Sequence, residues 1–200
     1  YLAEQQLRPQ TNVVFVFNSC EEGLGNLKGC RVIMEQYQGK VHEFISFDGS
    51  YTSLTTVAVG SERYDVCIKT EGGHSYGNFG NSNAIAAMAE LICRLYTIDA
   101  KKYPGQTTYN VGTITGGTSV NTIAQEAHML FEFRSDRIEG LSGIKQDVLK
   151  LFSDFGRRFD LTLQLLGRRP SMGAVDPAHM NRLIGEISSI IVRETGKAPT

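Results

Sequence analysis

The order of apolar segments between residues 54 and 168 restricts this chain most strongly to one kind of fold. Short β-rich runs are predicted at 54–59, 64–70, 109–115, 127–133 and 161–166, and amphipathic helices at 83–96 and 141–159. Gly60-Ser61-Glu62-Arg63 separates the first two runs and is expected to form the turn of a hairpin. The β-α-β-β-α-β order within this stretch favours an antiparallel sheet with both helices on one face.

The segment before residue 54 has a different pattern. Val13 to Phe17 is a short apolar run typical of a buried strand, 26–38 has helical spacing, and 41–47 alternates as a second strand. Strand, helix and strand in this order predict a βαβ unit with parallel strands, as in α/β domains. A last helix is predicted from Pro177 to Thr195. We therefore expect an inserted domain over residues 54–168, flanked by 1–53 and 169–200 as two parts of an α/β domain.

Carboxylates follow both predicted parallel strands. Glu21 and Glu22 come after the first strand and Asp48 after the second, and open α/β sheets bind their ligands at the carboxyl ends of strands. Adjacent like charges raise each other's pKa. A metal ion would remove this conflict, because one carboxylate can bind it while the other handles the proton of a metal-bound water. The alternative is a solvated helix N-terminus, which also favours negative charge. The placement at two strand ends favours a hydrolase.

Two glycine-rich turns and an arginine supply further candidates. Gly72 and Gly73 precede His74 and suit a tight bend that presents an imidazole to a cleft, although a turn histidine without a role has the same pattern. The turn at 116–121 ends at Asn121 and lacks the lysine and the spacing of a phosphate loop, which argues against nucleotide binding. Arg134 ends an apolar strand and could clamp a carboxylate bidentately or pair on the surface. Three other histidines have no partner at metal-ligand spacing and are interpreted as structural or exposed: His42, His128 and His179.

Composition excludes several classes of partner. Lys and Arg number 20 and Asp and Glu 21, and without a run of like charge neither nucleic acid nor an anionic membrane is expected to bind. No apolar stretch approaches the ~20 residues of a membrane span. The four cysteines lack CxxC spacing, which favours free thiols in a reducing cytoplasm over a disulfide framework. The chain begins at Tyr1 and ends just after a helical segment, so we expect an internal piece of a longer protein.

Together, these motifs resemble the co-catalytic zinc exopeptidase and deacylase family that includes peptidase T, carboxypeptidase G, the aminoacylases and succinyl-diaminopimelate desuccinylase. The order and spacing agree over nearly the whole chain. The matching segments are Asn18-Ser19-Cys20-Glu21-Glu22-Gly23, Phe47-Asp48-Gly49, Gly72-Gly73-His74-Ser75, Asn83-Ala84-Ile85, and Gly116-Gly117-Thr118-Ser119-Val120-Asn121 leading to Arg134. Asp48, where several deacylating members carry Glu, followed by Gly49, is most similar to the peptidase T-like branch.

The resemblance implies a fold and a metal centre. It implies part of a zinc-peptidase α/β catalytic domain with an inserted α+β, ferredoxin-like domain that serves as lid and dimerisation domain. Glu21 would be the general base and acid that takes a proton from the metal-bridging water. Glu22 would bind one zinc ion and Asp48 the other, as two co-catalytic ions about 3.5–4 Å apart.

The resemblance also implies residues that contact the substrate. His74 would help to hold the tetrahedral oxyanion and would reach the partner subunit's site in the dimeric members. Asn121 and Arg134 would contact a short peptide or N-acyl amino acid, with Arg134 at a terminal carboxylate. A homodimer formed through the inserted domain would follow from these roles.

The sequence departs from the family pattern in its metal ligands. The family's upstream His-x-Asp, its bridging aspartate and its C-terminal histidine have no counterpart, so the remaining ligands are expected outside this chain. The 200 residues alone are therefore expected to bind zinc poorly and to be inactive. The function predicted first is a zinc-dependent aminopeptidase acting on short peptides. Two alternatives stay open: an N-acyl amino acid deacylase, which shares every residue named, and a non-catalytic dimerisation or binding module that has lost metal.

Overall fold

The computed structural model describes the chain except for residues 1–3, 5, 7, 22 and 51. It divides into two compact units, Tyr1–Phe44 and Ile45–Thr200, and each is described by itself. The larger unit contains the sheet predicted from the sequence, and the smaller unit contains one helix. Glu21 lies in the smaller unit, whereas Asp48, His74, Asn121 and Arg134 lie in the larger unit.

The smaller unit contains the 3-10 turn η1 (Gly23–Gly25) and the helix α1 (Lys28–Gln36). The helix confirms the one predicted over 26–38. The strand predicted over 13–17 is wrong, since these residues join no ladder and their side chains are exposed, Phe17 by 100%. A parallel strand needs a neighbour for its N–H and C=O groups, and the described residues offer this segment none. The strand predicted over 41–47 is wrong for the same reason.

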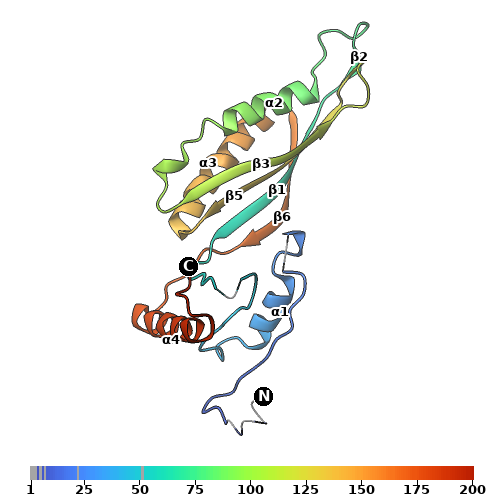
Figure 1. The fold of residues 1–200 in the computed structure, drawn as a ribbon. Coiled ribbons are helices and arrows are strands. Elements are labelled where there is room, and N and C mark those ends of the chain that lie inside the picture. The colour runs from blue at the N-terminus through green and yellow to red at the C-terminus, as the bar shows by residue number, and fades with distance from the viewer. Residues whose placement is uncertain (1–3, 5, 7, 22, 51) are drawn as a thin grey trace. The chain divides into compact units, whose positions relative to one another are not determined.

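A four-stranded antiparallel sheet forms the body of the larger unit (Figure 1). Its strands lie in the order β3-β5-β1-β6 and are β1 (Gly60–Lys69), β3 (Thr107–Gly116), β5 (Glu126–Ser135) and β6 (Asp160–Arg169). The last three confirm the strands predicted at 109–115, 127–133 and 161–166. The two central strands pair over their whole length, from Gly60 opposite Ser135 to Lys69 opposite Glu126.

Two helices cover one face of this sheet, as predicted (Figure 1). They are α2 (Ala84–Leu95) and α3 (Ile138–Gly156), and they confirm the helices expected at 83–96 and 141–159. The Asn83 side chain caps α2 by accepting hydrogen bonds from the N–H groups of Ile85 and Ala86, at 2.9 and 3.3 Å. The core between the layers includes Val66, Ile68, Met88, Leu91, Ala127, Met129, Phe131, Phe133, Ile144, Val148 and Phe152. The β-α-β-β-α-β order is therefore realised as an α+β, ferredoxin-like sandwich.

Three short elements complete the larger unit before its last helix. The 3-10 turn η2 (Ala100–Lys102) lies between α2 and β3. The strands β2 (Gly73–His74) and β4 (Thr122–Ile123) pair with each other in a separate two-stranded ribbon. This ribbon extends beyond one end of the four-stranded sheet (Figure 1).

The first strand of the sheet corrects the predicted hairpin. Residues 54–59 form no strand, and the segment from Gly60 to Arg63, predicted as a turn, is the first part of β1. Ser61 and Glu62 are buried there. Gly60 is needed because Ser171 passes close by: a Cβ at position 60 would lie 2.3 Å from the Ser171 Oγ. Ser61 and Glu62 are polar, as turn residues usually are, although both are buried inside the fold. Their polarity is the reason that the sequence predicts a turn at this place.

The helix α4 (Pro177–Thr195) has the bounds predicted from the sequence. The Asp176 side chain accepts a hydrogen bond from the Ala178 N–H at 3.0 Å, and Gly196 ends the helix in the left-handed conformation with φ of 72°. Within the described residues, no helix is long and apolar enough to cross a membrane. The division of the chain at residues 54 and 168 stays a prediction.

Among the described residues of the larger unit, Glu62 on β1 is the one carboxylate that is buried, with 3% exposure. Lys145 Nζ and Arg168 Nε lie 2.8 and 2.7 Å from its Oε1, and the Tyr64 hydroxyl donates to its Oε2. Burial opposes its ionisation, but the hydrogen bonds from Lys145 and Tyr64 and the two positive charges hold its pKa below the usual 4.5. This carboxylate joins β1, α3 and β6 in one network.

The substitution Glu62→Gln is expected to lower the free energy of unfolding by about 2 kcal/mol at pH 7, because the two cations lose a charged partner. Since the folded-state pKa of Glu62 is lowered, its contribution is fully present well above the usual value of 4.5 and is lost as the pH falls through the folded value. The difference between wild type and variant in urea denaturation should therefore shrink in acid. Glu186→Gln, which removes an exposed pair with Arg182 on α4, is the control and should cost less than about 0.5 kcal/mol. Equal losses for the two variants would contradict the buried network.

Candidate functional site

The β2–β4 ribbon brings His74 and Asn121 together. Gly73 pairs with Ile123 and His74 with Thr122, and the Ser75 N–H donates to the Asn121 carbonyl oxygen at 2.9 Å. Both side chains are exposed. Residues far apart in the sequence thus share one tip, as the family resemblance requires of two residues that act on the same substrate.

The hydrogen bonds of His74 fix its ring. Its Nδ1 accepts from the N–H groups of Tyr76 and Gly77, both at 3.3 Å, and its own backbone N–H donates to Asn78 Oδ1 at 2.9 Å. Because Nδ1 accepts, the proton of the neutral ring is assigned to Nε2. The Nε2–H of His74 is therefore the ring donor that can form a hydrogen bond with a ligand at the tip.

Asn121 is oriented in a similar way. The Ser119 hydroxyl donates to Asn121 Oδ1 at 2.6 Å, which directs the amide nitrogen of Asn121 away from the turn. The tip therefore carries two outward donors, one from an imidazole and one from an amide. Hydrogen-bond donors of this kind can stabilise a developing oxyanion where they meet the same oxygen atom.

Arg134 lies far from this tip, at the other end of the sheet. On β5 it pairs with Ser61 of β1 and Thr108 of β3, whereas Glu126, at the ribbon end of the same strand, pairs with Lys69. The eight positions from Glu126 to Arg134 correspond to about 26 Å of strand. One copy of the chain therefore does not bring Arg134 to the same point as His74.

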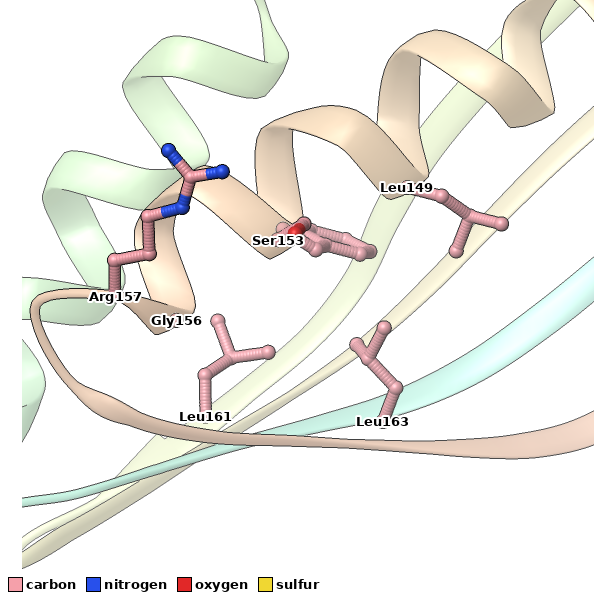
Figure 2. Close-up of a pocket in the computed structure, with 7 residues that line it drawn as sticks. Leu149, Ser153, Gly156, Arg157, Leu161 and Leu163 are labelled. Atoms are coloured by element: carbon pink, nitrogen blue, oxygen red, sulfur yellow. The ribbon is translucent and has the colours of Figure 1, made fainter.

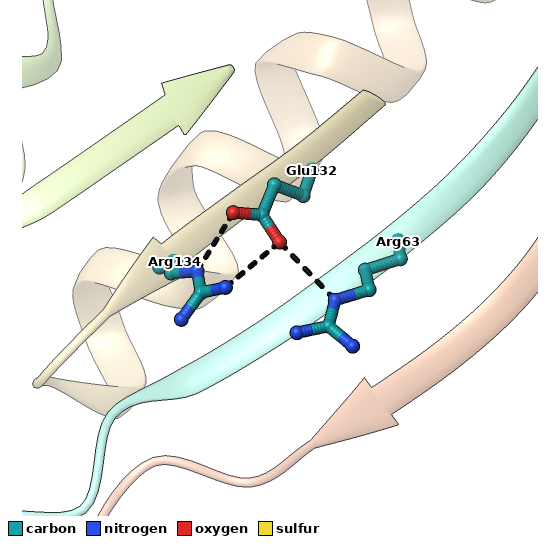
Figure 3. A network of polar contacts seen from close by, with 3 residues as sticks. All are labelled: Arg63, Glu132 and Arg134. Atoms are coloured by element: carbon teal, nitrogen blue, oxygen red, sulfur yellow. Dashed lines mark hydrogen bonds and ion pairs between the residues drawn. The ribbon is translucent and has the colours of Figure 1, made fainter. Parts of the chain in front are cut away.

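Arg134 is already paired with a carboxylate, as Figure 3 shows. Its Nε and Nη2 lie 2.8 and 3.0 Å from the two oxygens of Glu132, and Arg63 Nε from β1 lies 3.1 Å from Glu132 Oε2. Burial opposes ionisation of Glu132, but the hydrogen bonds from Arg134 and Arg63 lower its pKa below the usual value. Arg63, Glu132 and Arg134 together carry two positive charges and one negative charge on the open face of the sheet.

The acidic candidates are distributed over the two units. Glu21 is half-buried in the smaller unit, where its carbonyl oxygen accepts from the Leu27 N–H at 3.3 Å. Asp48 is exposed in the larger unit. Glu22 lies outside the described residues. Carboxylate oxygens suit a divalent cation, so the chemistry of these donors fits zinc, and the roles assigned to them stay predictions.

A further group with metal-ligand chemistry was missed in the sequence. Cys67, Glu126 and His128 bring one ligand atom each within 4.8 Å of one another on the face of the sheet that the helices leave open. His128 is interpreted from the sequence as structural or exposed, without a partner at metal-ligand spacing; in the structure its Nδ1 lies 3.0 Å from Asp65 and its Nε2 2.8 Å from Glu126. The spacing Glu126-x-His128 was the available signal, because residues two apart on a strand share a face.

An apolar hollow lies between the end of α3 and β6 (Figure 2). Leu149, Phe152, Ser153, Gly156, Arg157, Leu161 and Leu163 line it. None of the candidate catalytic, metal or substrate residues lies among them. The hollow is therefore lined by residues other than the candidates described above.

Gly73 is expected to be essential for the position of His74. Its φ is +134°, and an added Cβ would lie 2.8 Å from Asn78, the residue that accepts from the His74 N–H. Gly73→Ala should therefore destabilise the tip by about 1–3 kcal/mol, measured as faster amide hydrogen exchange at residues 72–78 and 119–123. Gly77→Ala is the control, because its φ is ordinary and the nearest atom would be 4.0 Å away. Unchanged exchange in Gly73→Ala would show that the tip does not depend on this glycine.

Comparison with known proteins matches residues 58–160 to the family described as peptidase dimerisation domain, M20_dimer. The chain is 25% identical over 157 residues to N-acetyldiaminopimelate deacetylase from Halalkalibacterium halodurans, and the alignment covers 73% of this chain and 42% of that protein. The chain thus spans less than half the length of the curated relative it matches.

Solved structures share the fold at low identity. Aminopeptidase PepT from Bacillus cereus has a TM-score of 0.56 and 18% identity, with 78% of this chain and 41% of that chain covered. An aminobenzoyl-glutamate utilization protein from Klebsiella pneumoniae has a TM-score of 0.56 and 20% identity, with 64% and 33% covered. Because the family match spans more than half of the chain and includes β1, both covering helices and the β2–β4 tip, the chain belongs to the M20 peptidase dimerisation domain family.

Proposed function

We propose that this chain is the central part of a zinc-dependent exopeptidase that hydrolyses short peptides, a peptidase T-like aminopeptidase that works as a homodimer. The observation that carries the proposal is the separation of its substrate-binding residues. His74 and Asn121 share the tip at one end of the sheet, and Arg134 lies about 26 Å of strand away from that end. Residues that contact one small substrate must then come from two copies of the chain.

Antiparallel pairing of two β3 strands would bring these ends together. β3 is an edge strand, next to β5 alone in the sheet. Its first residues lie beside Arg134, and its last residues lead through the turn at 116–121 to Asn121. A two-fold axis through the middle of the paired β3 strands places the N-terminal end of β3 in one copy beside the C-terminal end of β3 in the other. Arg134 of one subunit would then lie on the same side as His74 and Asn121 of its partner.

Exposed apolar side chains support a partner at this edge and at the tip. Ile114 on β3 and Ile85 on α2 are 50% and 42% exposed beside the open edge. Tyr76, Phe79 and Val120 flank His74 and Asn121 with exposures of 90%, 91% and 102%. Apolar groups gathered at an unpaired edge are typical of a protein–protein interface. A cytoplasmic location is part of the proposal and is supported by the free thiols of all four cysteines.

In the proposed mechanism each residue has a distinct task. Arg134 holds a terminal carboxylate of the substrate, and the partner subunit's His74 and Asn121 donate hydrogen bonds from Nε2–H and the side-chain amide to the carbonyl oxygen as it becomes negative. Glu21 accepts a proton from the attacking water and returns it to the leaving amine. Glu22 and Asp48 would each hold one of two zinc ions, with the remaining ligands outside this chain. Zinc, when bound, polarises the carbonyl and lowers the pKa of water.

A second candidate function is the deacylation of N-acyl amino acids. The named relative from Halalkalibacterium halodurans, a deacetylase of N-acetyldiaminopimelate, favours it. Asp48 followed by Gly49 favours the peptidase. Parallel assays of the full-length protein with tripeptides and with N-acetylated amino acids separate the two, because only one class should show saturable, chelator-sensitive hydrolysis. No hydrolysis of either class by the folded, zinc-loaded protein would favour a non-catalytic dimerisation module.

The two adjacent glutamates are expected to respond differently to substitution in the full-length protein. Glu21→Gln should keep the zinc content and lower kcat by about 10²–10⁴-fold, because only proton transfer is removed. Glu22→Ala should lose zinc as well as activity. Zinc per subunit by atomic emission and turnover are measured on the same samples, with the exposed Glu35 of α1, as Glu35→Gln, for control. Normal turnover in both variants would exclude the proposed roles.

Mixing two inactive variants tests the shared site. His74→Ala and Arg134→Ala homodimers should each be inactive, whereas mixed dimers have one site with both residues intact. After subunit exchange the mixture should recover roughly a quarter of wild-type activity, since about half the dimers are mixed and half their sites are complete. A mixture of His74→Ala with Asn121→Ala is the matched control and should recover nothing, because both residues come from the same tip. Equal recovery in the two mixtures, or none in either with exchange verified, would exclude a site built from two subunits.

A further inference from the structure

We propose that Cys67, Glu126 and His128 form a separate metal site, for a divalent ion of the zinc class, on the open face of the four-stranded sheet. Cys67 is on β1 directly opposite His128 on β5, and Glu126 is two residues before His128 on the same face. Their Sγ, carboxylate oxygen and imidazole nitrogen lie within 4.8 Å of one another. A thiol, an imidazole and a carboxylate are the ligand types that zinc prefers.

The ligand side chains would adjust their separations to admit the ion. At usual bond lengths to zinc, the ligand atoms of a tetrahedral site lie about 3.3–3.6 Å from one another. His128 Nε2 and Glu126 Oε1 are 2.8 Å apart, so they would separate by about half an ångström. The Glu126 side chain is 50% exposed and can move. The paired strands hold Cys67 directly opposite His128, and the Cys67 Sγ lies within 4.8 Å of the other two ligand atoms.

Asp65 supplies the support that a ligating histidine requires. Its Oδ1 lies 3.0 Å from His128 Nδ1, on the ring side opposite Glu126. A histidine that binds a metal commonly donates its other ring N–H to a carboxylate, which fixes the ring and directs the second nitrogen at the ion. Asp65 therefore acts as a positioning residue, and His128 Nε2 points toward the position proposed for the metal.

The contacts around His128 leave both carboxylates of the group with partners. The ring nitrogens lie 3.0 Å from Asp65 Oδ1 and 2.8 Å from Glu126 Oε1, and Lys69 Nζ lies 3.4 Å from Glu126 Oε2. An ion between His128 Nε2 and Glu126 would replace one contact between the two side chains with a bond to each of them, and Lys69 would keep its partner.

A second hollow opens onto Glu126 and His128, two of the three proposed ligands. It lies over the ribbon end of the open face and is lined by Glu126 and His128 together with Lys69, Thr115, Thr122 and Gln125. The groups around it are mostly hydroxyls and amides, which solvate an ion well. This site is independent of the zinc ions proposed at Glu22 and Asp48, since it uses none of their ligands.

Cobalt(II) is the probe for the site, because it replaces zinc and gives a charge-transfer absorption band only when a thiolate binds it. The chelator-treated chain, kept reduced with a phosphine, should show a saturable thiolate–cobalt band at one ion per chain. Cys67→Ser should abolish the band, and His128→Gln should weaken cobalt binding at least tenfold. Asp65→Asn should keep the band but weaken binding by about 10–100-fold. Circular dichroism shows whether each variant is folded.

The other cysteines are the matched controls. Cys93→Ser, on the exposed side of α2, and Cys20→Ser, next to the acidic pair, should keep the band unchanged. Binding of cobalt to Glu22 and Asp48 gives no thiolate band, so failure of the proposed zinc centre and failure of this site are distinguishable. No band in the folded wild type, a band that survives in Cys67→Ser, or a band lost in Cys20→Ser would each overturn the proposal.

Discussion

The ladder between β1 and β5 is the interaction on which the rest of the larger unit depends. The two strands pair in one unbroken register from Gly60 opposite Ser135 to Lys69 opposite Glu126. A slip by one residue would turn Val66 from the helices to the open face and bring its polar neighbours into the core. The ladder therefore fixes both the core and the length of sheet that separates the tip from Arg134.

The same register divides the sheet into two faces with different chemistry. The residues of β1 and β5 that face the helices are apolar except at the ends, and their alternation with polar residues leaves ionisable groups on the open face. These groups are then opposite one another across the strands: Cys67 with His128, and Arg63 with Glu132. Because the helix face is packed, any ligand of the sheet itself must approach from the open face. The two strands of the tip, β2 and β4, follow β1 and β3 in the chain.

The sequence predicts those elements whose signals are local. The helix at 177–195 has its cap at Asp176 and its stop at Gly196, and the one at 83–96 begins at Asn83. The strand at 13–17 is predicted from a short apolar run and the one at 41–47 from alternation, although a strand also depends on a neighbour that these local patterns do not show. Glu62 was misread as a turn residue because its partners, Lys145 and Arg168, are distant in sequence. For the site, the resemblance named His74, Asn121 and Arg134, but only the ladder shows which of them lie together.

Arg134 illustrates how a structural pair and a binding role can coexist. A guanidinium has five N–H donors, of which Glu132 takes one from Nε and one from Nη2. The remaining three are on Nη1 and the outer side of Nη2, an edge that still matches a second carboxylate bidentately. Arg63 adds a second positive charge to the same group. The single negative charge of Glu132 therefore does not neutralise both guanidinium groups. Glu132 thus holds the Arg134 side chain along the strand. The N–H groups on Nη1 and on the outer side of Nη2 stay available for a carboxylate of the proposed substrate.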